Sequence, residues 1–405
     1  MPEVPPSNYR WYMLTLCAAT ATLVISIPFS CMPVLFNEIS KDLDLSLVQI
    51  GTIWGIASLA GVFVGLISGL LSDRFGMRLT LCVSCILVGI TGALRGLSTD
   101  FLTLAVTVFF NGMARTILPI ILTKQIAIWF KEKNFALANG IGAMGMGLGL
   151  MLGPMISATI LSPLLGGWRN VLLLYGVVSV AIGILWLFFG RKPKKVASTI
   201  GYPNAASIRL GLLKLLRIRA LWLIGLTIML RTACVTGMMG YLPLYLRDRG
   251  LTAASSDNTL AIFFAASTIF VIPLSSLSDK LGSRKAILFP SLLVTSLCVG
   301  LLPLAQGITL WLLMILAGIF FDGFMAVISA MLLETDKVGL EYSGTALGLV
   351  FTIAQFGSVI SPPLGNSFAS TNPALPFVFW AALGVVALLP FIFTRETTSK
   401  RIRVS

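Results

Sequence analysis

Three charged residues lie inside long apolar runs of the sequence. They are Arg115, Arg231 and Asp322. A charge at the centre of a membrane helix costs roughly 2.5–3.5 kcal/mol, so such residues mark functional sites by default. An arginine binds an oxyanion through a planar two-point fork and keeps its charge when buried. Two arginines against one acid leave a net positive site, which favours a small anion and, because of the fork, a carboxylate.

The composition indicates what kind of element holds these charges. Of the 405 residues, 57% are apolar and only 11% are charged, and there is no histidine. A soluble chain normally has about 25% charged residues, so a soluble enzyme and a disordered chain are both excluded. Apolar runs of about 20 residues can cross a membrane as helices. We expect twelve such runs, at about 11–36, 47–71, 80–97, 101–124, 136–161, 168–190, 220–246, 258–277, 286–305, 309–333, 344–369 and 373–394.

The lysines and arginines predict which side of the membrane each loop faces. With twelve spans, both termini and the even-numbered loops lie on one side, which carries 22 of the 29 basic residues. The opposite side carries five, and the other two are Arg115 and Arg231. Because basic residues are enriched in cytoplasmic loops, we expect an integral plasma-membrane protein with both termini in the cytoplasm. The net charge of +14 then needs no nucleic-acid partner.

The three buried charges are predicted to lie at one depth. Arg115 is 9 residues from the cytoplasmic end of its run (124 − 115), and Arg231 and Asp322 are each 11 residues from theirs (231 − 220 and 333 − 322). At about 1.5 Å per residue, all three lie roughly halfway across the membrane. Arg95, near the outer end of its run, is expected to extend to the headgroups. In an empty site we expect Asp322 to form an ion pair with Arg231. Either Asp322 is a proton carrier that an arriving anion releases from this pair, or the pair is fixed and purely structural.

Two motifs occur twice, which indicates an internal repeat. Residues 69–78 read GLLSDRFGMR and residues 275–284 read SSLSDKLGSR, with their aspartates 206 residues apart (279 − 73). The pattern G-x8-G-x3-[GS]-P starts at Gly140 and again at Gly348, 208 residues apart (348 − 140). Two parallel six-span repeats are a known transporter plan. The domains that we expect are residues 1–190, a cytoplasmic linker with an amphipathic helix at 191–219, and residues 220–405.

Through these two motifs the chain resembles the major facilitator superfamily over nearly its whole length. The resemblance implies an all-α polytopic membrane protein, with twelve transmembrane helices in two six-helix pseudo-symmetric bundles, acting as a monomer among membrane lipids. It also implies a conformational latch, formed by Gly69, Asp73, Arg74, Gly76, Arg78, Asp279 and Arg284. Small residues and prolines of the second motif are expected to pack or kink helices, at Gly140, Gly149, Gly153, Pro154, Gly348, Gly357 and Pro362. For Arg74 and Arg78 the alternative is a role in topology alone.

In the superfamily, spans 1, 4, 7 and 10 line a central cavity, and three of these spans hold the buried charges. The candidate substrate-binding residues are Arg115, Arg231, Asn111, Thr227, Tyr241 and Tyr245. Asp322 is the candidate for proton coupling, and helix packing is the alternative for the hydroxyl and aromatic residues. Residues 133–141, KNFALANGI, are similar to the start of span 5 in monocarboxylate and oxalate:formate-type porters. This similarity agrees with an organic anion as substrate.

The sequence therefore predicts a secondary active transporter that moves a small organic anion by alternating access. The sequence does not distinguish between proton symport, exchange and uniport. It also does not identify the substrate or the direction of transport. One alternative is a drug or lipophile exporter of the same superfamily, although such relatives carry an arginine where Val108 stands. Another is a receptor or scaffold with this fold. The Cys82-x-x-Cys85 pair has no second pair or histidine beside it, so we predict that it packs and holds no metal. The sequence shows no nucleophile–base set and no phosphate loop, so we also predict no cofactor and no enzymatic activity.

Overall fold

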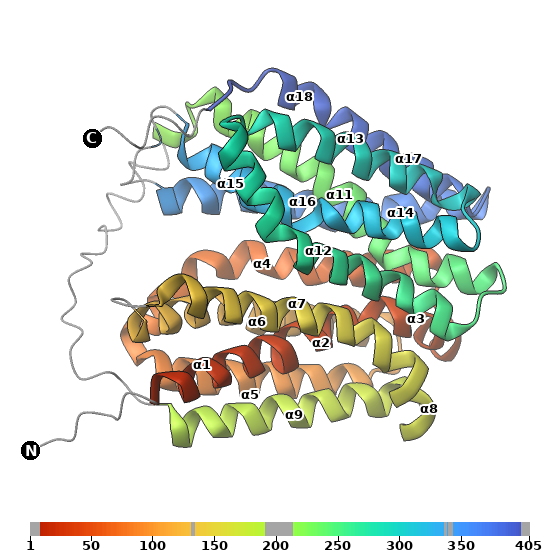
Figure 1. Ribbon diagram of the computed structural model, residues 1–405. Helices are drawn as coiled ribbons and strands as arrows, with labels where there is room; N and C mark the ends of the chain where they lie inside the picture. Colours follow the sequence, from red (N-terminus) through yellow and green to blue (C-terminus); the bar gives the residue numbers. More distant parts are fainter. Residues whose placement is uncertain (1–8, 131–133, 191–213, 336–337, 339–342, 398–405) are drawn as a thin grey trace, which may run out of the picture. The chain divides into compact units, whose positions relative to one another are not determined.

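The structure is a computed structural model that describes residues 9–130, 134–190, 214–335, 338 and 343–397, without the side chains of 62–75, 136 and 343. Helices make up nearly all of this part of the chain (Figure 1). Most of the predicted linker at 191–219, with its amphipathic helix, lies outside the described residues.

Most of the predicted spans are single helices, and some are built from several helical segments. The segments of the first half are α1 (Tyr9–Thr20), α2 (Ile27–Ser30), α3 (Met32–Asp42), α4 (Leu47–Phe75), α5 (Met77–Gly96), α6 (Phe101–Trp129), α7 (Phe135–Ile156), α8 (Ser162–Leu165) and α9 (Trp168–Phe189). The segments of the second half are α11 (Arg219–Asp248), α12 (Ala253–Leu281), α13 (Lys285–Leu301), α14 (Ile308–Ile319), α15 (Phe321–Leu333), α16 (Ser343–Ser367), α17 (Leu375–Val386) and α18 (Leu388–Ile392). In the described part of the chain, 11 helical segments are long and apolar enough to cross a membrane. With the 29-residue helix α4, they give the all-helical membrane fold that the sequence predicts.

The chain divides into two compact units. The first unit contains Met1–Ser46, Ile56–Gly201 and Gly250–Ala261. The second unit contains Leu47–Gly55, Tyr202–Arg249 and Ile262–Ser405. The first residues of α4 therefore belong to the second unit, and the first residues of α12 belong to the first unit.

Small residues let helices of the first unit approach each other closely. α5 lies along α9 and α6 (Figure 1). A Cβ atom on Gly89 of α5 would lie 2.6 Å from the carbonyl oxygen of Gly176 on α9, so a larger residue there would separate the two helices. At the far end of α9, Trp186 is fully buried and its indole N–H donates to Thr20 Oγ1 of α1 at 2.9 Å.

The second unit is built around α11, which lies along α16 (Figure 1). A Cβ atom on Gly357 of α16 would lie 2.2 Å from the carbonyl oxygen of Met229 on α11. Trp380 of α17 is fully buried between Gly237 and Gly365, and its indole N–H donates to the carbonyl of Ser361 at 3.2 Å. The absence of a side chain on each glycine makes room for the ring.

The predicted packing glycines do not all pack. In α7, a Cβ atom on Gly149 would lie 2.7 Å from the carbonyl oxygen of Thr22, and one on Gly153 would lie 3.0 Å from that of Ile27. Gly140 and Gly348, by contrast, have no described atom within 4 Å of the Cβ position, so the prediction of close packing is wrong for these two. Both lie near the start of their helices, where the described neighbours leave open space.

Both predicted prolines lie inside helices. Pro154 lies inside α7, which changes at Ser157 into a π-helical turn, Ser157–Leu161. Pro362 lies inside α16, and its backbone is 2.7 Å from the Cβ position of Gly51. A proline inside a helix removes one backbone hydrogen bond, which makes such local departures from α-helical geometry less costly.

Several predicted spans, among them the first and the tenth, contain interruptions that the apolar runs do not indicate. In the first span the π-helical turn Ala21–Ser26 separates α1 from α2. In the tenth span the chain breaks at Phe320, where α14 ends and α15 begins. Wide helical turns and broken spans both occur frequently at functional sites of membrane proteins.

Candidate functional site

Arg115 lies in the middle of α6, 14 residues from each end of the helix (115 − 101 and 129 − 115). Its guanidinium carbon is 4.2 Å from the centre of the Phe29 ring of α2. Among the described residues no carboxylate forms an ion pair with it. A ring contact of this kind stabilises a cation by about 0.5–2 kcal/mol but does not neutralise it. Arg115 therefore brings an uncompensated positive charge into the middle of a span.

Asn111 lies one turn before Arg115 and is almost fully buried. Its side-chain amide donates to the Val88 carbonyl at 3.0 Å and to Thr91 Oγ1 at 3.2 Å, both on α5. These bonds fix α6 against α5 and thereby hold the helix face that carries Arg115. The described contacts of Asn111 are with the protein, so substrate binding by this residue stays a prediction.

Arg231 lies in the middle of α11 and is 2% exposed. Its Nη2 donates to the carbonyls of Phe320 at 3.1 Å and Phe321 at 2.9 Å, on the two sides of the break in the tenth span. The guanidinium carbon is also 4.2 Å from the ring centre of Phe324. The carbonyl of Phe320 also accepts from the backbone N–H of Phe324 at 3.3 Å, so Arg231 adds a charged donor at the start of α15 and ties α11 to the break. The buried Nε of Arg231 has no hydrogen-bond partner among the described residues.

Asp322 lies in the first turn of α15, directly after the break. Its Oδ2 accepts from Ser267 Oγ of α12 at 2.6 Å, and its own backbone N–H donates to the same Ser267 Oγ at 3.0 Å. The predicted ion pair between Asp322 and Arg231 is not present, so that prediction is wrong for this structure. The reason is that Arg231 is occupied by the carbonyls at the break, while the first turn of α15 places Asp322 beside Ser267.

Three further candidates make their described contacts within the protein. Thr227 is fully buried, and its hydroxyl donates to the Leu223 carbonyl one turn earlier at 2.8 Å. Tyr241 donates to the Pro373 carbonyl at 3.3 Å. The ring centre of Tyr245 lies 4.9 Å from that of Phe377. These contacts support the packing alternative for all three residues.

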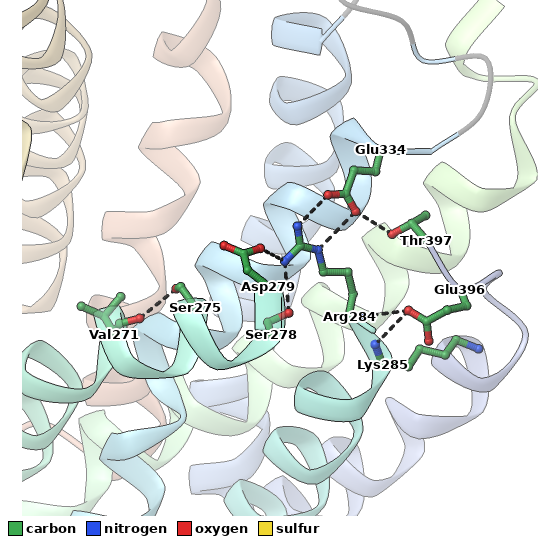
Figure 2. A network of polar contacts seen from close by, with 9 residues as sticks. All are labelled: Val271, Ser275, Ser278, Asp279, Arg284, Lys285, Glu334, Glu396 and Thr397. Carbon is green, nitrogen blue, oxygen red and sulfur yellow. Dashed lines mark hydrogen bonds and ion pairs between the residues drawn. The ribbon is translucent and has the colours of Figure 1, made fainter. Parts of the chain in front are cut away.

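A dense polar network surrounds Arg284, which lies between α12 and α13 (Figure 2). Its guanidinium donates to both oxygens of Glu334, at 2.6 Å and 3.2 Å, and to Asp279 Oδ1 at 2.5 Å. The Arg284 side chain is 8% exposed and that of Glu334 is 10% exposed, whereas that of Asp279 is 64% exposed. The hydrogen bonds that Arg284 donates to Glu334 raise the pKa of Arg284 further above its ordinary value. Two predicted latch residues, Asp279 and Arg284, thus contact each other, with Glu334 as an unpredicted third member.

The same network includes residues that follow α18. Glu396 accepts from the backbone N–H of Arg284 at 2.8 Å, and Thr397 Oγ1 donates to Glu334 Oε2 at 2.9 Å (Figure 2). A carboxylate at the start of a helix satisfies backbone N–H groups and interacts favourably with the helix dipole. Three segments that are distant in sequence, at 278–285, 334 and 396–397, therefore meet at one end of the second unit.

The corresponding motif of the first unit is only partly described. The side chains of Asp73 and Arg74, like the surroundings of Gly69, lie outside the described residues. Gly76 has φ of 80°, a conformation that favours glycine, and it stands between α4 and α5. Arg78 donates to the carbonyl of Leu187 near the end of α9. The latch function of this motif stays a prediction.

Arg95 is a buried cation that the prediction misplaced. It is 2% exposed, and its Nη1 donates to the Pro28 carbonyl at 3.3 Å, while its Nε donates to the Gly92 carbonyl at 3.3 Å. Side chains of a helix tilt toward its N-terminus, so Arg95, at the last turn of α5, points back along the helix. The expected extension to the headgroups is therefore wrong, and the direction of the span could have indicated this.

The described residues contain no group of three histidine, cysteine or acidic side chains that could hold a metal ion. Cys82 and Cys85 are both buried in α5 as free thiols. The candidate site therefore consists of cations, one carboxylate and their hydrogen-bonding partners.

Repeated bundles of apolar helices, with charged residues buried inside the spans, define a polytopic membrane transporter. A family model described as the Major Facilitator Superfamily matches residues 14–258 and 250–404. The chain belongs to this superfamily.

Individual relatives agree in fold and in class. The chain is 25% identical to the "Probable nitrate/nitrite antiporter" of Thermus thermophilus, over 98% of this chain and 93% of the relative. It is 23% identical to the 4-hydroxybenzoate transporter of Pseudomonas aeruginosa, over 95% of this chain and 93% of that one. The crystal structure of a bacterial homolog of the human lysosomal transporter Spinster superposes with a TM-score of 0.81 at 15% identity, covering 97% of this chain and 98% of that one. The last similarity concerns the fold alone.

Proposed function

We propose that this transporter moves a small organic anion, which it recognises through a carboxylate group, and that Arg115 is a principal contact. The observation that carries the proposal is the charge of Arg115, which lies in the middle of α6 without a carboxylate partner among the described residues. A half-buried cation in the middle of a span is costly without a counter-ion, and an anionic ligand reduces that cost on binding. The guanidinium fork matches the two oxygens of a carboxylate.

The relatives support the same chemical class. One is named for nitrate and nitrite, and another for 4-hydroxybenzoate. Each of these compounds carries a small planar oxyanion group. At identities of 23–25% the particular substrate does not transfer, but the preference for an oxyanion agrees with the buried arginines.

The second unit offers a proton site. Asp322 is bonded to Ser267 and not to Arg231, so its carboxylate has no cationic partner within ion-pair distance among the described residues. A proton taken up at Asp322 offsets the charge of an incoming anion, which couples one proton to one anion. Arg231 is the candidate second anion contact, for which an arriving carboxylate has to compete with the carbonyls of Phe320 and Phe321.

Transport by alternating access, a monomeric state and a plasma-membrane location with cytoplasmic termini complete the proposal. The excess of basic residues on one side, 22 against five, supports the orientation.

A thermal-shift screen of the purified protein tests the substrate class. The compounds are nitrate, formate, succinate and 4-hydroxybenzoate, with glucose and tetraphenylphosphonium as neutral and cationic comparisons. We expect at least one anion to raise the melting temperature of the wild type and to lose that effect in Arg115→Gln. Stabilisation by the cation alone would favour the exporter alternative and contradict the proposal.

A further inference from the structure

Arg95 and Arg115 come from different helices but contact adjacent residues of α2. Arg95 of α5 donates to the carbonyl of Pro28, and Arg115 of α6 lies over the ring of Phe29. Asn111 links the same two helices, and its Nδ2 and Arg95 Nη2 lie 3.5 Å and 3.6 Å from the Cβ position of Gly92. Two cations are thus gathered within the first unit.

The two guanidinium groups retain unused donors. An arginine has five N–H donors. Arg95 uses Nε and Nη1, and none of the described residues accepts from its Nη2. Arg115 donates to no acceptor among the described residues, and its contact is the ring of Phe29. Neither forms an ion pair with a described carboxylate. The site therefore holds two positive charges and several free donors.

We propose that Arg95 is a second anion-binding residue beside Arg115, and that this part of the first unit binds a small organic dianion, with one carboxylate for each arginine. The inference rests on the proposed function and extends it from an anion to a doubly charged one. A monoanion leaves one buried cation uncompensated, whereas a dianion neutralises both. The Pro28–Phe29 pair holds the two guanidinium groups in place, so little ordering is needed when the ligand arrives.

The alternative is that Arg95 only fastens α5 to α2 through the Pro28 carbonyl. The two roles predict different results. If Arg95 only fastens the two helices, its loss reduces the stability of the protein and weakens the binding of every ligand equally. A binding role makes the effect depend on the charge of the ligand.

The experiment measures binding of three compounds of one size and shape but different charge, namely succinate, succinamate and succinamide. Isothermal titration calorimetry on the purified full chain compares the wild type with Arg95→Gln and Arg115→Gln. Arg169→Gln is the matched control, because Arg169 also donates to backbone carbonyls of the first unit, those of Gly96 and Ser98, but its side chain is 36% exposed.

We expect the wild type to bind succinate more tightly than succinamate, and succinamide not at all. Arg95→Gln should weaken the binding affinity for succinate by roughly tenfold to a hundredfold, as expected for loss of a hydrogen bond to a charged group. The same variant should change the binding affinity for succinamate by less than about threefold, because a monoanion needs only Arg115. The preference for the doubly charged compound should thereby disappear, and Arg169→Gln should keep it.

Two results would overturn the inference while leaving the proposed function intact. One is an equal loss of binding affinity for succinate and for succinamate in Arg95→Gln. The other is unchanged succinate binding in Arg95→Gln together with a loss in Arg115→Gln. If the wild type bound neither succinate nor succinamate, this inference would be contradicted, whereas the proposed function is contradicted only if no anion of the wider screen binds.

Discussion

Asp322 and Ser267 form a reciprocal pair: the serine hydroxyl donates to the carboxylate at 2.6 Å and accepts from the aspartate backbone N–H at 3.0 Å. The pair joins the first turn of α15 to the middle of α12. It separates Asp322 from Arg231, which is bonded to the carbonyls at the helix break. The acid is thus held in place by a neutral partner, which leaves its charge available for a coupled proton.

Proton coupling at Asp322 can be tested by removing its charge. Asp322→Asn keeps the shape of the side chain and can still bond to Ser267. We expect the variant to bind and exchange anions but to lose accumulation driven by a pH gradient in proteoliposomes. Ser267→Ala, which keeps the acid, should retain part of the accumulation. Unchanged pH-driven accumulation in Asp322→Asn would show that the residue is only a counter-charge.

Arg231 is expected to be needed for both stability and transport. Arg231→Ala removes the charged donor that Arg231 supplies to the carbonyls of Phe320 and Phe321, and loss of hydrogen bonds to a charged group costs about 1.5–3 kcal/mol. We expect a lower melting temperature and little transport. Arg231→Lys keeps the charge without the planar fork, so it should restore stability more than transport. Near-normal uptake by Arg231→Ala would contradict the assignment, and Arg249→Ala at the end of α11 is the control for loss of an arginine.

The network at Arg284 predicts an unequal contribution from its two acids. Glu334→Gln disrupts a nearly buried two-point ion pair and should lower the free energy of unfolding by about 1.5–3 kcal/mol. Asp279→Asn, at an exposed position, should cost less than about 1 kcal/mol. Thermal unfolding of the two variants measures the difference. Equal losses would show that exposure does not set the strength of these contacts.

The raised pKa of Arg284 gives this network a defined pH dependence. A cation whose pKa is raised on folding contributes its full stability below its unfolded-state pKa and loses it only above that value, and the ordinary pKa of arginine lies far above neutral pH. The difference in melting temperature between the wild type and Arg284→Gln should therefore stay constant between about pH 7 and pH 10. A difference that falls steadily over this interval would contradict the assignment.

Close packing of α7 against the first span can be measured with a pair of glycines in the same helix. Gly149→Ala places a Cβ atom 2.6 Å from the Cβ of Ser26, and overpacking of this kind costs roughly 1–3 kcal/mol. Gly140→Ala enters open space and should be neutral or stabilising by up to about 1 kcal/mol, because alanine favours the helix. Equal melting temperatures for the two variants would contradict the described packing.

The membrane fold could be predicted because long apolar runs have few stable alternatives to helices in a bilayer. The positions of Arg115, Arg231 and Asp322 inside spans followed from the same runs. Their partners could not be predicted, since partner choice depends on the break at Phe320 and on the rotation of each helix. Hydropathy shows neither. The burial of Arg95 was predictable in principle, because the direction of α5 sets the tilt of its side chains.

The central claim, that a small anion is transported by way of Arg115, is tested most directly by uptake into proteoliposomes. Uptake of nitrate, formate, succinate, 4-hydroxybenzoate, glucose and tetraphenylphosphonium is compared for the wild type and Arg115→Gln. The account predicts saturable uptake of at least one anion, reduced by roughly tenfold to a hundredfold in Arg115→Gln. Wild-type uptake of anions by Arg115→Gln, or transport of the neutral or cationic compound alone, would contradict it.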